Sequence, residues 1–99
     1  MTPPPPKKSY VYLLKSLKDE NFYLGWTTDV ERRLNEHNSG LTFSTKSRIP
    51  FELIHFESYE SEGLAKQRER KLKKNPRMYS LFKKAALRML HRRLKGVVG

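Results

Sequence analysis

Aromatic and β-branched residues gather in three short runs that polar segments separate. The first two runs are residues 10–15 (YVYLLK) and 22–26 (FYLGW), with a polar break at residues 18–21 between them. Two such runs on either side of a short polar break predict a β-hairpin. A third run, residues 51–59 (FELIHFESY), is long enough to pair with the first. The pattern therefore predicts a small three-stranded antiparallel sheet.

A helix is predicted directly after the hairpin, at residues 29–38. Thr28 and Glu31 form a capping-box pattern at its start, and residues 38–40 (NSG) supply a stop. An arginine and a histidine share the helix face that should turn toward the core, where polar groups need partners. On a 3.6-residue period that face carries Val30, Arg33, Leu34 and His37.

Two further helices are expected after the third strand. One begins near Ser61 and ends at about Lys74, and Asn75 and Pro76 then provide the cap and first turn of the other. The inward stripe predicted for the first of them is Leu64, Ala65, Arg68, Glu69 and Leu72. The stripe of the last helix, which its spacing assigns to core packing, is Met78, Leu81, Phe82, Ala85, Ala86 and Met89.

A length of 99 residues fits one domain with one modest core. We expect the domain to span residues 9–95, after a disordered Pro- and Lys-rich tail at residues 1–8 and before a frayed C-terminus at residues 96–99. The predicted fold class is α/β, a small three-stranded antiparallel sheet flanked by helices in the order β-β-α-β-α-α.

The charge of the chain indicates the class of its binding partner. The net charge is +11, and between Lys66 and Lys95 the only acid is Glu69. A surface this positive favours a polyanion, and nucleic acid is the commonest one. A solubilising charged face and attraction to anionic lipid are the alternatives.

No segment is long and apolar enough to cross a bilayer, and the N-terminus lacks the apolar centre of a secretory signal. We therefore expect a cytoplasmic protein, associated with the nucleoid if the organism is bacterial. The sequence has no cysteine, which excludes disulfides and thiolate metal sites. Histidines, carboxylates and hydroxyls supply the remaining chemistry.

Several candidate site residues also have ordinary explanations. Tyr12 and Tyr23 lie on either side of the hairpin turn, where tyrosines are usually packing residues. Gly25 can be a bulge, or it can let a phosphate approach the backbone. Glu69 can pair with Lys73 four residues later. Surrounded by cations, it can equally stay ionised and bind a hard divalent cation.

Phosphate contacts are expected from hydroxyls and cations outside this set. Residues 41–50 (LTFSTKSRIP) are rich in both, although an ordinary solvated loop would look similar. The predicted DNA-binding residues are Gly25, Thr27, Ser44, Thr45, Lys46, Arg48, Lys73, Lys83 and Lys84.

Taken together, these motifs resemble the GIY-YIG nuclease superfamily in order and spacing. They are Tyr10-Val11-Tyr12, Tyr23-Leu24-Gly25, the arginine of DVERRL, His37, and Glu69 in AKQRERKLK, so the resemblance covers residues 9–74. The words GWTTD, ERRL, HNSG and STK are similar to those of its small single-domain, excision-repair-nuclease-like branch. Three departures are Tyr10 in place of Gly, Trp26 after Gly25, and no Asn at the usual distance beyond Glu69.

The resemblance implies a catalytic set of Tyr12, Tyr23, Arg33, His37 and Glu69. Glu69 would bind one divalent metal, Mg²⁺ or Mn²⁺, since one carboxylate with waters and a phosphate oxygen can hold a single ion. Arg33 would brace the charge on the transferring phosphate, and Tyr12 or Tyr23 would align or deprotonate the attacking water. His37 would position a phosphate or a water.

The expected function is therefore a metal-dependent DNA endonuclease with weak sequence specificity or a preference for branched or damaged DNA. It would act as a monomer or weak dimer, with a protein partner as one source of specificity, and without a membrane. The alternative is a non-catalytic nucleic-acid-binding module on the same fold. A membrane-surface protein that uses the last helix is a weaker third hypothesis.

Overall fold

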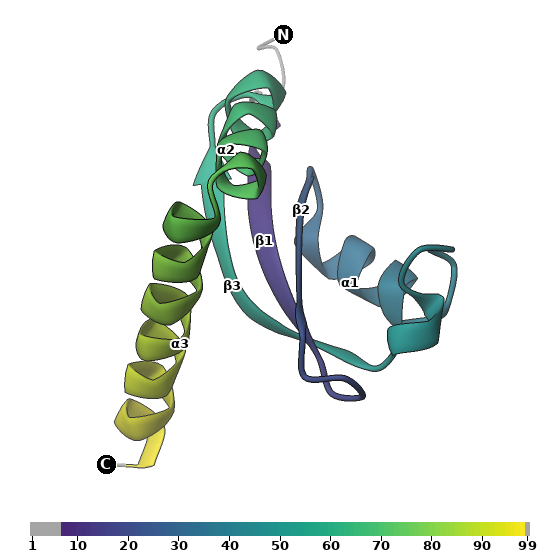
Figure 1. Ribbon diagram of the computed structural model, residues 1–99, viewed down its shortest axis with the longest axis vertical. Helices are drawn as coiled ribbons and strands as arrows, with labels where there is room; N and C mark the ends of the chain where they lie inside the picture. Colours follow the sequence, from purple (N-terminus) through teal and green to yellow (C-terminus); the bar gives the residue numbers. More distant parts are fainter. Residues whose placement is uncertain (1–6, 99) are drawn as a thin grey trace, which may run out of the picture.

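The computed structural model describes residues 7–98, with side chains to residue 96. The expected order β-β-α-β-α-α is confirmed (Figure 1). Its elements are β1 (Ser9–Ser16), β2 (Phe22–Thr27), α1 (Val30–Asn38), a 3₁₀ turn η1 (Lys46–Arg48), β3 (Phe51–Tyr59), α2 (Glu62–Lys74) and α3 (Pro76–Val98). Most of the predicted tail, residues 1–6, and residue 99 lie outside the described residues. Residues 96–98, where fraying is predicted, continue α3 in this structure.

The sheet is antiparallel in the order β2-β1-β3, so the predicted hairpin and the pairing of the third strand with the first are confirmed. Tyr12 lies in the central strand, opposite Gly25 on one side and Phe56 on the other. A β-bulge shifts the β1–β3 register between Leu13 and Leu14. In the part of β1 before the bulge, alternate residues point to opposite faces of the sheet.

The two faces of the sheet carry different helices. In Figure 1, α2 and α3 lie on one side of the strands and α1 on the other. The first face holds the main core, made by Val11, Leu13, Leu24, Ile54, Ala65, Leu72, Phe82 and Ala86. A smaller cluster lies on the α1 face, where Tyr12, Leu14 and Phe51 pack with Leu34. Strand alternation therefore places Tyr12 beneath α1.

The helix ends follow local capping chemistry. Asp29 caps α1 by accepting the Arg32 N–H, so the predicted Thr28–Glu31 capping box is wrong by one residue. Asp is as good a cap as Thr, and the sequence offered both. The stop is confirmed, because Gly40 adopts φ +78° and the Leu41 N–H reaches back to the Glu36 carbonyl. The predicted caps of α2 and α3, at Ser61 and Asn75, each bond a backbone N–H.

The predicted inward stripes need correction. In α2 only Ala65 and Leu72 are buried, and Leu64 is 48% exposed. In α3 the buried and partly buried residues are Tyr79, Phe82, Ala86 and Leu90, whereas Met78, Leu81, Ala85 and Met89 are exposed. A three-stranded sheet offers α3 one narrow line of contact, so the buried stripe is narrower than the helical pattern predicts. No helix in residues 7–98 is long and apolar enough to cross a membrane.

Candidate active site

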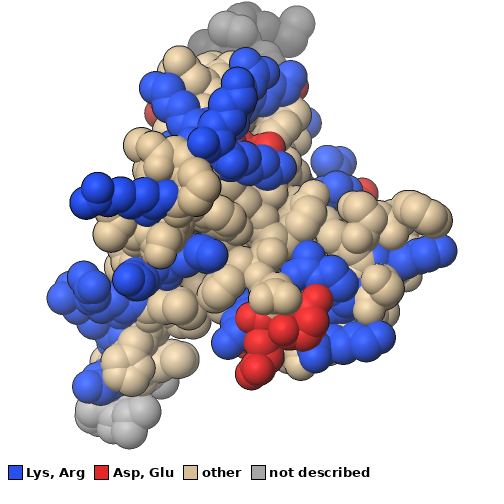
Figure 2. All heavy atoms as spheres, in the orientation of Figure 1, with Lys and Arg blue, Asp and Glu red and all other residues tan. Residues whose placement is uncertain are grey.

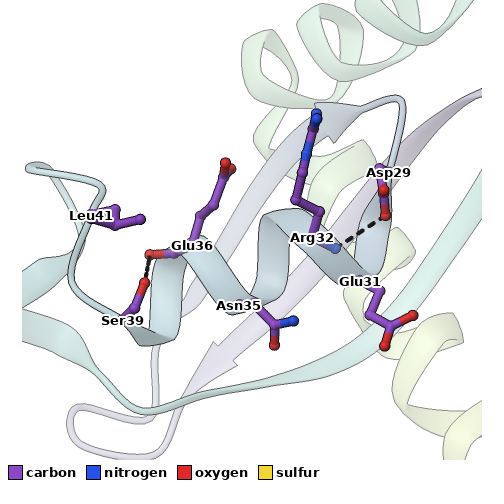
Figure 3. Close-up of a pocket in the computed structure, with 7 residues that line it drawn as sticks. All are labelled: Asp29, Glu31, Arg32, Asn35, Glu36, Ser39 and Leu41. Atoms are coloured by element: carbon purple, nitrogen blue, oxygen red, sulfur yellow. Dashed lines mark hydrogen bonds between the residues drawn. The ribbon is translucent and has the colours of Figure 1, made fainter.

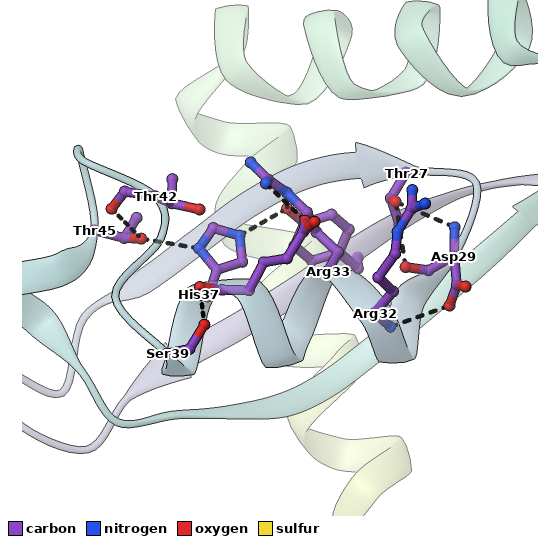
Figure 4. Close-up of polar contacts among 10 residues, drawn as sticks. Thr27, Asp29, Arg32, Arg33, His37, Ser39, Thr42 and Thr45 are labelled. Atoms are coloured by element: carbon purple, nitrogen blue, oxygen red, sulfur yellow. Dashed lines mark hydrogen bonds and ion pairs between the residues drawn. The ribbon is translucent and has the colours of Figure 1, made fainter.

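Four side chains from three parts of the chain meet beneath α1. Tyr12 comes from β1, Arg33 and His37 come from α1, and Thr45 comes from the loop before η1. The Tyr12 hydroxyl lies 3.0 Å from His37 Nε2, and Arg33 Nε donates to the same hydroxyl at 3.4 Å. His37 Nδ1 lies 2.9 Å from Thr45 Oγ1 (Figure 4). The inward face predicted for α1 is confirmed, and its polar groups have partners.

Gly25 makes room for the Tyr12 side chain. A Cβ atom at Gly25 would lie 2.5 Å from the Tyr12 hydroxyl oxygen and 2.7 Å from its Cζ. Real Cβ atoms do not come this close to other atoms, so any larger residue must displace the tyrosine. Gly25 is itself buried and leaves space for the Tyr12 ring, and its predicted contact with DNA stays a prediction.

Gly25→Ala is therefore expected to lower the free energy of unfolding by about 1–3 kcal/mol, the usual cost of overpacking. Urea unfolding of the purified variant measures this change. Gly63→Ala is the matched control, because a Cβ there meets only Ser61 Oγ at 4.0 Å. Gly63 lies in α2, so its replacement should stabilise the protein by up to about 1 kcal/mol. Equal effects of the two substitutions would contradict the proposed crowding.

The hydrogen bonds around His37 have a definite direction. Thr45 Oγ1 donates to the Thr42 carbonyl at 3.4 Å, so it accepts from His37 Nδ1–H. That tautomer leaves Nε2 without a proton, ready to accept from the Tyr12 hydroxyl. At the other end, the same hydroxyl accepts from Arg33. The Thr45 end thus assigns the tautomer of His37, and the bond from Arg33 to Tyr12 is compatible with it.

The protonation states agree with this direction. Burial raises the pKa of Tyr12 to about 12. Burial, followed by the Arg33 charge, lowers the pKa of His37 to about 4. Burial also lowers the pKa of Arg33, but hydrogen bonds to Tyr12 and Glu36 outweigh it and raise that pKa overall. At neutral pH the site therefore holds a neutral tyrosine, a neutral histidine and a charged arginine.

Tyr23 completes the α1 side of the site. Its ring centroid lies 4.9 Å from that of His37 and 6.3 Å from that of Tyr12. Arg33 is held on the other flank by Glu36, at 3.1 Å. Glu36 is not among the predicted site residues, although its position three residues after Arg33 on one helix is a usable signal.

Glu69 lies on the other side of the β2 edge. It belongs to α2, its side chain is 17% exposed, and its carboxylate pairs with Lys73 at 2.8 Å. It lines a pocket of about 320 Å³ with Trp26, Lys66, Arg70, Lys73 and Lys74. No hydrogen bond in the described part of the chain joins Glu69 to the Tyr12 cluster, but the Glu69 charge contributes to raising the pKa of Tyr12. Trp26 of β2 lines the Glu69 pocket and directly follows Gly25, against which Tyr12 packs, so β2 connects the two halves of the site.

The donor set fits a single hard cation. No group of three His, Asp or Glu side chains in residues 7–98 could enclose a metal ion. Mg²⁺ is commonly bound by one or two carboxylates, with waters and substrate phosphates as its other ligands. Glu69 is a carboxylate of this kind, with space beside it in a cationic pocket that suits phosphate.

Two predicted DNA-binding hydroxyls are buried instead. Thr27 is 6% exposed, and its hydroxyl bonds the backbone of Asp29 at the start of α1. Thr45 is 1% exposed and is occupied with His37. His37 is fully buried with both ring nitrogens engaged, so neither nitrogen is free in this structure for the predicted contact with a phosphate or water. Residue type alone could not show which hydroxyls of the loop turn inward.

The other predicted DNA-binding residues remain accessible to different degrees. Ser44, Lys46 and Lys84 are exposed. Arg48 is held by Asp19 at 2.6 Å, and Lys83 lies over the Phe22 and Tyr79 rings. An aromatic ring outside the predicted set is also accessible in this loop, since Phe43 is 84% exposed with the Lys46 ammonium 4.7 Å from its centroid.

Another hollow lies apart from the Tyr12–His37 cluster. It has a volume of about 450 Å³ and lies on the outer side of α1 (Figure 3). Its lining is Asp29, Glu31, Arg32, Asn35, Glu36, Ser39 and Leu41. Three carboxylates against one guanidinium disfavour a phosphate there, so we assign it no role in binding nucleic acid.

Sequence comparison identifies a family and relatives for this chain. Residues 8–83 match the family model described as the GIY-YIG catalytic domain. A UPF0213 protein of Syntrophus aciditrophicus is 43% identical over 76 residues, which cover 75% of this chain and 86% of that protein. A UPF0213 protein of Haloquadratum walsbyi is 45% identical over 65 residues, covering 65% of this chain and 72% of the relative.

A solved structure is similar as well. The solution NMR structure of a UPF0213 protein from Bacillus halodurans is 34% identical, with a TM-score of 0.47, and the match covers 77% of this chain and 83% of that one. The family model spans most of the chain and includes the hairpin, α1 and Glu69. The chain therefore belongs to the GIY-YIG catalytic domain family, a family of nucleases.

Proposed function

We propose that this protein is a metal-dependent endonuclease that hydrolyses phosphodiester bonds in DNA. The observation that carries the proposal is the cluster of Tyr12, Arg33 and His37, buried beneath α1 and adjacent across β2 to the Glu69 pocket. It combines a hydroxyl that can orient water, a fixed cation for a phosphate and a carboxylate for a metal. Membership of a nuclease family supports the same chemistry.

Each residue has a role that its surroundings favour. Arg33 is charged and held by Tyr12 and Glu36, so it can brace a phosphoryl oxygen without reorganising. Glu69 would hold Mg²⁺ or Mn²⁺, which when bound supplies Lewis-acid stabilisation of the phosphate. Tyr12 lies within hydrogen-bond reach of Arg33, so its hydroxyl can align a water beside a phosphate bound there.

The cationic surface supports DNA as the substrate. In Figure 2, Lys and Arg side chains gather over α2 and α3, while acidic side chains form a patch near the tip of the β1–β2 hairpin. Phosphate contacts of this kind position DNA without selecting a sequence. We therefore propose weak sequence specificity or a preference for DNA structure, and a cleavage rate that falls as salt rises.

The two tyrosines can be distinguished by pH. If Tyr12 must ionise to solvent before it acts as the base, a pKa near 12 means that the wild-type rate rises about tenfold for each pH unit between 7 and 9. We expect Tyr12→Phe to lower the rate by about 10²- to 10⁴-fold and to remove any such rise. Tyr23→Phe should keep the slope. A flattened profile in Tyr23→Phe alone would assign the proton transfer to Tyr23.

One observation favours a binding module without cleavage. Glu69 is already paired with Lys73, so the carboxylate has a partner when no metal is bound. Such a module would bind DNA with a steep dependence on salt and with no requirement for a divalent ion.

Nicking of supercoiled plasmid and cutting of a branched oligonucleotide, each with Mg²⁺, Mn²⁺ or EDTA, tests the proposal. We expect cleavage with either metal and none in EDTA, with similar rates on branched substrates of different sequence. Binding of both substrates without any cleavage would favour the binding module. Rates that follow base sequence rather than DNA structure would contradict the proposed specificity.

A further inference from the structure

His37 is connected to solvent only through its neighbours. The ring is fully buried, and its two nitrogens bond Tyr12 and Thr45. Both partners are themselves almost fully buried, at 2% and 1% exposure. A buried histidine that fails to touch substrate can still act in a reaction if a group that does touch substrate exchanges a proton with it. Tyr12 is the group in position to do so, because its hydroxyl also bonds Arg33, whose side chain is 32% exposed.

We propose that His37 accepts the Tyr12 proton during cleavage, and that Thr45 is the positioning residue that keeps Nε2 free to accept it. The inference deepens the proposed function and rests on it. Thr45 can do this because its own proton is committed to the Thr42 carbonyl, at 3.4 Å. It therefore presents a lone pair to His37 Nδ1 and selects the tautomer with hydrogen on that nitrogen.

The proton transfers balance as follows. The attacking water forms its bond to phosphorus and gives a proton to the Tyr12 oxygen, while the Tyr12 O–H bond breaks and that proton moves to His37 Nε2. The bond between phosphorus and the leaving oxygen breaks, and that oxygen takes a proton from solvent water. The imidazolium keeps both hydrogen bonds, to Tyr12 and Thr45, until it returns its proton through Tyr12. In this relay Tyr12 never carries a full negative charge, so the cleavage rate should change little between pH 7 and 9, whereas a Tyr12 that ionised before reacting would make the rate rise with pH.

The electrostatics favour the transfer only when substrate is present. The groups that face His37 are Tyr12 from β1, Tyr23 from β2, and Arg33 and Glu36 from α1. Burial and then the Arg33 charge lower the pKa of His37, and Glu36 opposes them. A phosphate bound to Arg33 would offset the guanidinium charge and make His37 a better acceptor. Substrate binding would thus prepare the acceptor.

The test compares Thr45→Val with Thr45→Ser. Valine keeps the shape and loses the hydroxyl, whereas serine keeps the hydroxyl. Long-range ¹H–¹⁵N spectra of the His37 ring in the free protein should show hydrogen on Nδ1 in the wild type and in Thr45→Ser. In Thr45→Val we expect that tautomer to be lost or mixed, and cleavage at pH 7 to fall about 10²-fold, against less than about threefold for Thr45→Ser.

Thr42→Val is the control, because Thr42 contributes its backbone carbonyl and the substitution leaves that group in place. The inference is overturned if the wild-type ring carries hydrogen on Nε2, or if Thr45→Val keeps both the tautomer and the rate. Should Thr45→Val fail to fold, a Nε2–H wild-type spectrum or a Thr45→Ser rate reduced as far as that of Tyr12→Phe would overturn it. A wild type that cuts no DNA contradicts the proposed function, while the spectrum still decides whether Thr45 selects the tautomer.

Discussion

Glu69→Gln is expected to lower the rate of DNA cleavage in Mg²⁺ by about a thousandfold. Glutamine keeps the size of the side chain but removes the negative charge, and a neutral amide oxygen is a much weaker ligand for Mg²⁺. Lewis-acid stabilisation by a bound metal contributes several kcal/mol, and about 1.4 kcal/mol corresponds to tenfold in rate. Single-turnover cleavage of a branched oligonucleotide, with enzyme in excess, measures the effect without a contribution from product release.

Glu62→Gln provides the matched control. Glu62 lies on the same helix and pairs with Lys66 at 3.1 Å, just as Glu69 pairs with Lys73 at 2.8 Å. Both substitutions remove one i,i+4 ion pair, which contributes only about 0.3–0.5 kcal/mol to stability. The control should therefore cut at nearly the wild-type rate. Titration with Mn²⁺ by electron paramagnetic resonance should show weaker binding in Glu69→Gln alone, and unchanged binding would remove Glu69 as the metal ligand.

The secondary structure was predictable because its determinants are local. The strands follow from clustered aromatic and β-branched residues, and the helix starts at Ser61 and Asn75 follow from single capping side chains. The same local logic separates Arg33 from Arg32. Helical spacing from Val30 turns Arg33 inward, and the structure places its Nε 3.4 Å from Tyr12 while Arg32 is exposed.

The environment of the site was not predictable from local pattern. Thr45 and Ser44 are adjacent hydroxyls in one polar loop, yet Thr45 is buried against His37 and Ser44 is exposed. The path of the loop from α1 to β3 decides which of the two hydroxyls turns inward. The hydrophobic pattern of the sequence does not predict that path. The inward stripe predicted for α3 is wrong for a related reason. The width of the sheet decides how many apolar residues of the helix become buried.

Arg33→Gln is expected to lower cleavage by about 10²- to 10³-fold, the usual effect of removing a preorganised group that stabilises transition-state charge. Its guanidinium is held in place by the Tyr12 hydroxyl and the Glu36 carboxylate before any substrate arrives. Little of its interaction with the phosphate is then spent on ordering a long side chain. The same single-turnover assay should show the loss in the rate constant rather than in the substrate affinity.

Arg32→Gln separates this role from general electrostatics. Arg32 adjoins Arg33 on α1 and carries the same charge, but it is exposed, and its backbone N–H rather than its side chain bonds the Asp29 cap. Either substitution lowers the net charge by one, so nonspecific attraction to DNA should weaken about equally in both. Only Arg33→Gln should slow the chemical step. If both variants lost activity in parallel, and added DNA restored both, the arginines would be contributing affinity alone, and the hydrogen bond from Arg33 to Tyr12 would be a packing contact without a part in phosphate chemistry.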